Sequence, residues 1–251
     1  MENKKQPYNL SSAALHIMAM VFMLCDHLWG AVFPDAVWLT CIGRIAYPLF
    51  AFMLVEGYFY THDIKRYIMR LFILALISEI PFDLMCTGTV FYPYHQNVIW
   101  TFLIGLLLIC LIERVKKSGK AWKVWLTAFA AVIIGFVAGF AIMTDYYGAG
   151  VLTVLVFYFF RGRKWWNYIG QLIGMYIINV EMLGGRCYPV VIFGHEFELM
   201  QQGLAMLALI PIWLYRGRQG YHAKWFRYFC YAFYPVHMLV IFLIWRSLIN
   251  G

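Results

Sequence analysis

The stretch Ala13–Phe33, AALHIMAMVFMLCDHLWGAVF, decides the fold because it is apolar over a length that can cross a lipid bilayer as one helix. About 20 residues at 1.5 Å per residue match the roughly 30 Å of the hydrocarbon core. The same stretch carries Asp26 and His27 side by side near its end, where each is costly in lipid. The stretch therefore indicates a membrane helix in which two ionisable residues serve a function.

The rest of the chain has the same apolar character. Of its 251 residues, 63% are hydrophobic and only 13% are charged, and the mean hydropathy is +0.71. Soluble domains are much less apolar, so we expect an integral membrane protein whose helices satisfy the backbone hydrogen bonds. We predict an all-α fold, a polytopic transmembrane bundle of about nine helices that forms one domain over residues 1–251. The further expected spans are Val37–Tyr60, Tyr67–Met85, Val98–Ile112, Val124–Met143, Gly148–Phe160, Trp165–Leu183, Leu199–Tyr215 and Tyr228–Ile249.

The basic residues predict how this bundle is oriented. If the N-terminus is cytoplasmic, Lys4 and Lys5 lie on the cytoplasmic side. Every other lysine and arginine then also falls in a cytoplasmic segment, except Arg44, Arg186 and Arg246. The net charge of +8 is then a sign of topology, and no nucleic-acid partner is needed to explain it. We expect a multi-pass protein of the cell (cytoplasmic) membrane, with the lipid bilayer around it.

Charged residues on three successive expected helices lie at one depth. At about 1.5 Å per residue, Asp26 lies roughly 20 Å along its outward helix and Arg44 roughly 10 Å below the outer surface on the return. Glu79 comes to the same level on the third helix. Each charge alone costs several kcal/mol in lipid, so we expect these side chains to face one another.

Prolines accompany the ionisable residues. A proline cannot donate the usual helical hydrogen bond, so it weakens the helix beside it. Helices weakened next to charges are typical of segments that line a polar cavity. The three cases are Pro48 after Arg44, Pro81 between Glu79 and Asp83, and Pro235 before His237.

Each of these residues also has a structural interpretation. Arg44 either neutralises Glu79 or Asp26 in an ion pair or contacts a ligand directly. Glu79 and Asp83 lie one helical turn apart and repel each other unless a cation or a shared proton intervenes. His237 is either a core histidine bonded to a freed carbonyl or a catalytic group.

The sequence has no pattern typical of a metal site. Its six cysteines lack C-x-x-C spacing, and His195-Glu196 lacks the second histidine of H-E-x-x-H. We therefore expect no metal. Cys86 and Cys187 fall in outward loops and form either a disulfide or two unpaired thiols.

His27 is the strongest candidate for chemistry because it is the imidazole that adjoins an acid in the outer polar layer. A neutral imidazole held by a carboxylate is a competent general base toward an amine or a hydroxyl. Neighbouring residues on a helix do not face each other, so Asp26 supports the ring only if the helix ends or bends there. Gly30 and Pro34 are signals for such an ending.

Several stretches together resemble the TraX family, in order and over nearly the whole chain. The more specific parts are the Arg-x-Ala-x-Pro-Leu-Phe segment from Arg44 and the closing Tyr-Pro-x-His at Tyr234–His237. The matching stretches are Asp26-His27, Gly43–Phe52 with Glu56-Gly57, Ser78–Asp83, Asn97 with Thr101 and Gly105, Asp145–Gly148, and Phe229–His237.

The resemblance implies an activity. TraX proteins are associated with conjugation and are held to acetylate the N-terminus of pilin, and they resemble transmembrane acyltransferases that use acetyl-CoA. This implies cytosolic acetyl-CoA as donor and an amine or hydroxyl of a pilin-like peptide or a sugar as outer acceptor. His27 would deprotonate the acceptor, Asp26 would orient the ring, and Arg44 would stabilise the oxyanion. The acceptor-binding residues implied are Glu79, Asp83, Asn97, Asp145, Tyr146 and His237.

Two other classes of function fit part of the pattern. A transporter or flippase would also use broken helices and buried ionisable residues, but its halves should be related by an inverted repeat, which the sequence does not show. A non-enzymatic assembly factor would hold a secreted partner in the membrane, and it would tolerate His27→Ala.

Overall fold

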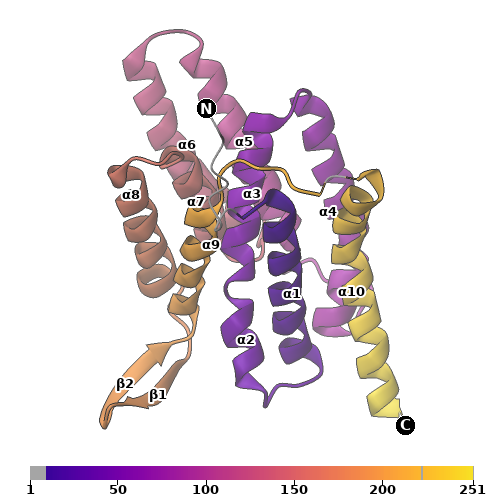
Figure 1. Cartoon of the computed structure of the whole chain (residues 1–251). Coiled ribbons are helices and arrows are strands. Elements are labelled where there is room, and N and C mark those ends of the chain that lie inside the picture. The colour runs from indigo at the N-terminus through magenta and orange to yellow at the C-terminus, as the bar shows by residue number, and fades with distance from the viewer. Residues whose placement is uncertain (1–9, 222, 251) are drawn as a thin grey trace.

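The computed structural model describes residues 10–221 and 223–250, so Lys4 and Lys5 lie outside the described residues. Helices dominate this part of the chain (Figure 1). The α-helices are α1 (Ser12–Ala31), α2 (Val37–Gly43), α3 (Ala46–Tyr60), α4 (Ile64–Thr87), α5 (Val98–Lys116), α6 (Ala121–Ala141), α7 (Tyr147–Phe159), α8 (Trp165–Tyr176), α9 (Leu209–Leu214) and α10 (Lys224–Asn250). The other elements are the π-helix η1 (Ile177–Met182), the 3₁₀ helix η2 (Gln202–Ala208) and the strands β1 (Cys187–Ile192) and β2 (His195–Met200).

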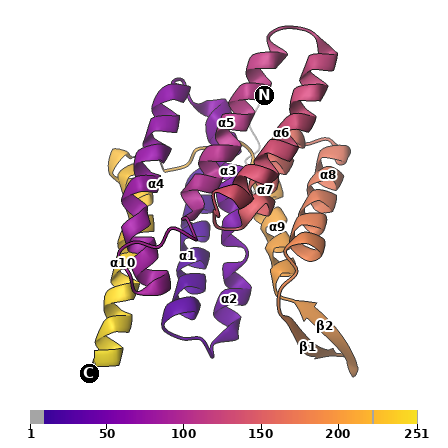
Figure 2. The ribbon, with the colours of Figure 1, turned by 180° about the vertical axis from the view of Figure 1, so that it is seen from behind.

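The helical segments run up and down between two ends of the bundle, as both ribbon views show (Figures 1 and 2). Five of the described segments are long and apolar enough to cross a membrane. They are Ser12–Ala31, Val37–Tyr60, Val98–Lys116, Ala121–Ala141 and Lys224–Ile249. The expected membrane class of the fold is therefore supported, with Tyr147–Phe159 and Gln202–Leu214 as shorter apolar helices.

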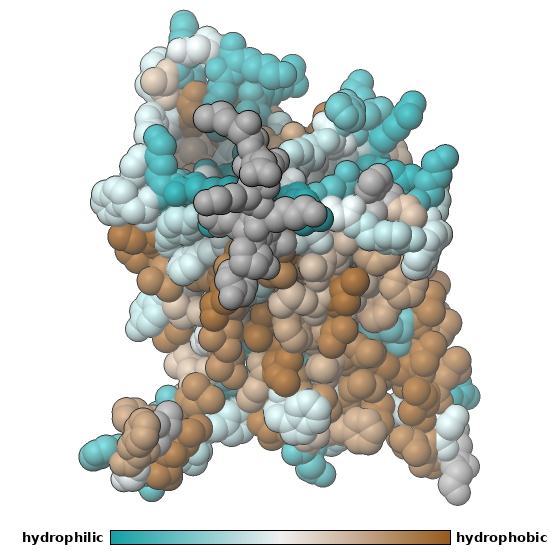
Figure 3. Space-filling model, viewed as in Figure 1, coloured by the Kyte–Doolittle hydropathy of each residue, from teal (hydrophilic) through white to brown (hydrophobic). Residues whose placement is uncertain are grey.

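The two ends of the bundle differ in polarity. The basic end holds the loops 61–63, 117–120, 160–164 and 215–221, and hydrophilic residues gather there above a broad hydrophobic surface (Figure 3). We call the other end, with loops 32–36, 88–97, 142–146 and the β1–β2 hairpin, the distal end. On α6, Trp125 and Phe129 are 77% and 66% exposed. An apolar surface of this kind fits contact with lipid.

A β-hairpin corrects the all-α prediction. Residues 187–200 pair as two antiparallel strands with Ile192 opposite His195. Phe193 and Gly194 form the turn with φ of 51° and 81°, which matches the positive φ values of a type I′ turn. The span expected from Leu199 therefore begins only at Gln202.

The prolines break one helix and leave two continuous. Arg44 and Ile45 separate α2 from α3, so the helix is interrupted beside the cation as expected. Pro81 and Pro235 instead lie inside the uninterrupted helices α4 and α10. Tertiary packing outweighs the local cost of a missing hydrogen bond at these two positions.

Candidate active site

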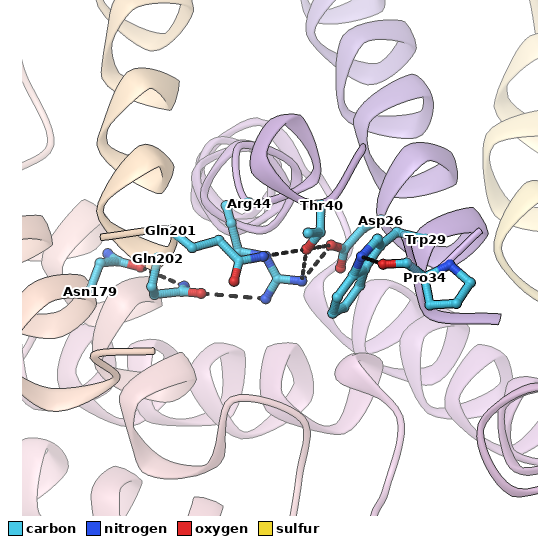
Figure 4. A network of polar contacts seen from close by, with 8 residues as sticks. All are labelled: Asp26, Trp29, Pro34, Thr40, Arg44, Asn179, Gln201 and Gln202. Carbon is cyan, nitrogen blue, oxygen red and sulfur yellow. Dashed lines mark hydrogen bonds and ion pairs between the residues drawn. The ribbon is translucent and has the colours of Figure 1, made fainter. Parts of the chain in front are cut away.

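Asp26 and Arg44 form an ion pair in the distal half of the bundle, with side chains that are 19% and 18% exposed. Asp26 lies on α1, and Arg44 lies in the break between α2 and α3. The Thr40 hydroxyl donates to Asp26 Oδ1 at 2.7 Å and accepts from Arg44 at 3.1 Å. Of the two partners considered for Arg44, the structure has Asp26, and the three side chains converge in Figure 4.

Amide side chains extend this network to the far side of Arg44. Gln201 donates to the Thr40 hydroxyl at 2.7 Å, and Gln202 accepts from Arg44 at 3.4 Å. Gln202 in turn donates to Asn179 Oδ1 at 3.0 Å (Figure 4). Asn179 lies in the π-helix η1 and Gln202 begins the 3₁₀ helix η2. Such departures from α-geometry are frequent at functional sites.

Close helix packing holds the ion pair in place. A Cβ atom added to Gly43 would lie 2.4 Å from Asp26 Cβ, so only glycine allows α1 and α2 to approach this closely. In the described part of the chain, Arg44 Nε is buried without a hydrogen-bond acceptor. A buried donor without a partner is costly, so this N–H is an unsatisfied donor at the centre of the network.

His27 pairs with His237. His27 Nδ1 lies 2.7 Å from His237 Nε2, and the rings are parallel within 8° with centroids 4.8 Å apart. His237 Nδ1 lies 2.7 Å from the Phe233 carbonyl oxygen, and the Phe233 ring stacks on the His237 ring with centroids 4.8 Å apart. The resemblance implied an acceptor-binding role for His237, but in the structure it contacts His27 directly.

These contacts assign the protons of both rings. The Phe233 carbonyl only accepts, so His237 Nδ1 carries a proton and, in the neutral ring, its Nε2 accepts. His27 Nδ1 must then donate, which leaves His27 Nε2 with a free lone pair. Within residues 10–221 and 223–250, no group hydrogen-bonds this nitrogen, and the nitrogen is not fully buried. His27 is thus arranged as a proton acceptor.

Asp26 does not orient the His27 ring, contrary to expectation. Helix α1 continues without a break to Ala31, so the neighbouring side chains of Asp26 and His27 point in different directions. Asp26 is bonded to Arg44 and Thr40 instead. The supporting contact for the ring comes from His237.

The charges around His27 include the expected distal residues. Asp145 and Arg44 both act electrostatically on His27, and Arg44 also interacts with Tyr146. Tyr146 adopts φ of 60° and stacks on Tyr47 with centroids 4.3 Å apart. The structure therefore brings His27, Arg44, Asp145 and Tyr146 into one region.

Glu79 belongs to a separate cluster. It accepts hydrogen bonds from Asn97 and from Trp100 Nε1, the latter at 2.9 Å. Glu79 is not in the ion pair with Arg44, which corrects the expectation that the charges of the first three spans all face one another. Two donors at the start of α5 bind Oε2 of Glu79 instead.

Asp83 is almost fully buried one turn further along α4, at 1% exposure. Its Oδ2 accepts from the Tyr92 backbone N–H at 2.8 Å. Among the described residues, Asp83 Oδ1 and Glu79 Oε1 are buried without partners. Separate hydrogen-bond donors therefore hold the two carboxylates, and each retains a free oxygen.

His95 is a polar residue of this region that sequence reasoning did not single out. Its Nε2 lies 3.5 Å from Asp145 Oδ1, and its ring packs against Phe82. The hydrogen bond to Asp145 raises the pKa of His95, and burial opposes this only in part. Its position in the loop just before Asn97 could have indicated from the sequence that His95 belongs to this region. Two backbone bonds fix the loop, because Gln96 pairs with Met143 and Asp145 at 2.9 Å each.

The candidate metal ligands, the two outward cysteines and the uncharged polar residues of this region are arranged as follows. In the described part of the chain, no group of three His, Cys, Asp or Glu residues is arranged to hold a metal ion. Cys86 and Cys187 are both exposed free cysteines. Thr40, Asn179, Gln201 and Gln202 complete the network around Arg44. They are uncharged, so the argument from the cost of a charge in lipid did not mark them.

Comparisons with known proteins agree with the resemblance. The family model described as TraX protein matches residues 11–245. A relative from Dichelobacter nodosus, described as "Probable fimbrial assembly protein FimC, serogroup H1", is 26% identical over 247 residues. The match covers 93% of this chain and 95% of that protein. No solved structure matches the chain.

Proposed function

We propose, from the premise that the chain belongs to the TraX family, that it is a membrane-embedded acyltransferase of the acetyl-CoA-dependent type. It moves an acetyl group from cytosolic acetyl-CoA to an amine or hydroxyl at the distal end, which faces outward in the cell membrane. The observation that carries this proposal is the His27–His237 pair, which leaves His27 Nε2 free to accept a proton.

The residues supply the parts of an acyl transfer. His27 Nε2 takes the proton of the acceptor N–H or O–H as the acceptor attacks the thioester carbonyl. The carbon–sulfur bond then breaks, and the departing thiolate takes that proton from His27. The attack creates an oxyanion, and Arg44, with a buried N–H that lacks an acceptor, stabilises it. His237 stabilises the charged ring of His27, because Nε2 of His237 accepts the hydrogen bond from His27 Nδ1 before and after Nε2 of His27 takes the proton.

Asp26 and its neighbours hold Arg44 for this role. Its carboxylate and the Thr40 hydroxyl fix one side of the guanidinium, and Gln202 binds the other. A guanidinium fixed in advance by its neighbours stabilises developing charge without rearranging during the reaction. Asp26 is therefore a positioning residue for Arg44 in the proposed mechanism.

The acceptor side is acidic. Asp145 and Asp83 lie at the distal end with Glu79, and Asp83 and Glu79 each keep one buried oxygen without a partner in the described residues. Such oxygens accept hydrogen bonds from the N–H groups of a neutral amine or from sugar hydroxyls. The fimbrial relative favours a peptide amine, so we propose the N-terminus of a fimbrial or pilin-like subunit as the acceptor, with a glycan as the alternative.

A non-enzymatic assembly factor is the second candidate. The description of the relative from Dichelobacter nodosus favours it, because that description refers to assembly and to no reaction. Under this reading the polar network only stabilises the bundle, and subunit binding does not depend on proton transfer.

The test measures thiol release from acetyl-CoA by the purified protein with acceptor peptides that have a free or a blocked N-terminus. We expect His27→Ala to lower the rate by about 100-fold or more, the usual size of a general-base contribution. His16→Ala is the matched control, because His16 lies on the same helix and bonds only within its first turn. Equal rates for wild type and His27→Ala would favour the assembly factor.

A further inference from the structure

A pocket opens between the segments that meet at the basic end. It has a volume of about 250 Å³, and it lies between the inner end of α3, the loop before α8 and the residues after α9. Its lining includes three arginines, Arg161, Arg163 and Arg216, against one carboxylate, Glu56. The pocket is thus a positively charged hollow at the end of the bundle where basic residues gather.

The arginines differ in how far their charge is neutralised. Arg161 is paired with Glu56 at 2.6 Å, and its guanidinium lies 4.0 Å from the centroid of the Phe59 ring. Arg163 makes one bond of 3.3 Å, to the Tyr215 carbonyl oxygen. In the part of the chain that the structure describes, Arg216 has no ion pair or hydrogen bond. A guanidinium has five donors, so most of those of Arg163 and Arg216 are free for an anion.

Glycines and aromatic residues shape the walls of this pocket. Gly162 and Gly217 have φ of 143° and 77°, and a Cβ on Gly217 would lie 2.9 Å from the Tyr60 hydroxyl. Larger residues would therefore be strained at both turns and would narrow the space. Tyr60, 58% exposed at the rim, offers a flat surface for a planar ring. Charge for phosphate and an aromatic face for a base occur together here.

We propose that this pocket binds the phosphate-bearing nucleotide end of the acyl donor, with Arg163 and Arg216 as the principal phosphate contacts. The identity of the donor rests on the proposed function. A volume of about 250 Å³ is below the roughly 300 Å³ at which typical small-molecule sites begin. It therefore takes a phosphorylated end group, and the rest of the molecule extends beyond it. An aromatic rim beside two free arginines favours a nucleotide over inorganic phosphate.

The experiment measures equilibrium binding of labelled coenzyme A, which carries no acyl group, to the full chain in zwitterionic lipid nanodiscs. We expect Arg163→Ala and Arg216→Ala each to weaken binding by about tenfold, as for the loss of a charge-assisted hydrogen bond. Arg246→Ala is the matched control, because Arg246 is an arginine near the distal end of α10 and should leave the affinity unchanged. Adenosine 3′,5′-bisphosphate should compete, and adenosine should not.

The outcomes separate this proposal from the acyltransferase reaction. Coenzyme A binding that both substitutions weaken supports the pocket whether or not His27 proves catalytic. Binding that neither substitution changes, or no binding to the wild type, overturns it, even if acetyl transfer is observed. A second arm adds phosphatidylglycerol to the nanodiscs; loss of coenzyme A binding there would assign the pocket to an anionic lipid headgroup and also overturn the proposal. Arg216→Ala keeps the test valid if Arg163→Ala misfolds, because Arg216 is exposed.

Discussion

His27 Nδ1 lies 2.7 Å from His237 Nε2, although the two residues are 210 positions apart in the chain. This contact joins α1 to α10, the first and last helices of the described chain. Two hydrogen bonds in series link His27 to His237 and His237 to the Phe233 carbonyl oxygen. Because that oxygen can only accept, the donor in each of the two bonds is fixed. The reactivity of a nitrogen on α1 is therefore controlled by a backbone oxygen on α10.

Replacement of His237 by phenylalanine should slow acetyl transfer without weakening substrate binding. Phenylalanine keeps the stacked ring but cannot accept the proton of His27 Nδ1, so the His27 tautomer is no longer fixed. We expect kcat to fall by about 10- to 100-fold with little change in KM, as for a residue that acts through the general base. Steady-state kinetics over a range of pH measures this, and His237→Gln, which can still accept, should recover part of the rate. A rise in KM at constant kcat would contradict it.

Asp26→Asn should destabilise the protein, because it leaves Arg44 as a partly buried cation without its counter-charge. Loss of one partner of a buried ion pair typically costs about 3 kcal/mol or more, and the partial exposure of this pair puts the expected loss at or below that value. The measurement is thermal unfolding in detergent. The double variant Asp26→Asn with Arg44→Met should be more stable than Asp26→Asn alone. Equal stability of both variants would mean that the ion pair contributes nothing.

The sequence was sufficient for the membrane class, because apolar runs of membrane length leave few alternatives to helices. It also located the ion pair region, since a charge on each of two adjacent spans must find a partner in lipid. It could not choose between Asp26 and Glu79 as the partner of Arg44. That choice depends on Gly43, where the absence of a side chain lets α1 approach.

Some long-range contacts and some local elements could not be predicted from the sequence, for different physical reasons. His237 contacts His27 only because α10 returns to α1, and helix order in a bundle cannot be read from hydropathy. The β-hairpin was missed because its apolar residues continue toward an apolar span, while the turn at Phe193 lacks the usual Asn-Gly or Asp-Gly signal. Arg44, with Pro48 four residues later, was recognisable because the missing hydrogen bond acts locally.

Gly43→Ala should lower both stability and activity. The added Cβ would lie 2.4 Å from Asp26 Cβ, so α1 and α2 must separate and the ion pair must shift. We expect a loss of about 1 to 3 kcal/mol, the usual cost of overpacking. The control is Gly30→Ala on α1, where the added Cβ meets no described atom within 4 Å apart from the adjoining backbone of its own helix. Thermal unfolding compares the two variants, and a similar decrease in both would argue against tight packing at Gly43.

The stability of the protein should fall slightly as the pH rises through the pKa of His95. The hydrogen bond that His95 donates to Asp145 raises the folded-state pKa of His95 above its usual 6.5. A group with a raised folded pKa contributes its full stabilisation below the unfolded pKa and loses it as the pH passes the folded pKa. The effect is small because the side chains of His95 and Asp145 are 36% and 34% exposed. Unfolding temperatures from about pH 6 to pH 9 should fall in the wild type and less steeply in His95→Gln.

His62→Gln, in a loop at the basic end, is the control and should keep the wild-type slope. An unchanged slope in His95→Gln would show that the contact with Asp145 does not couple folding to protonation.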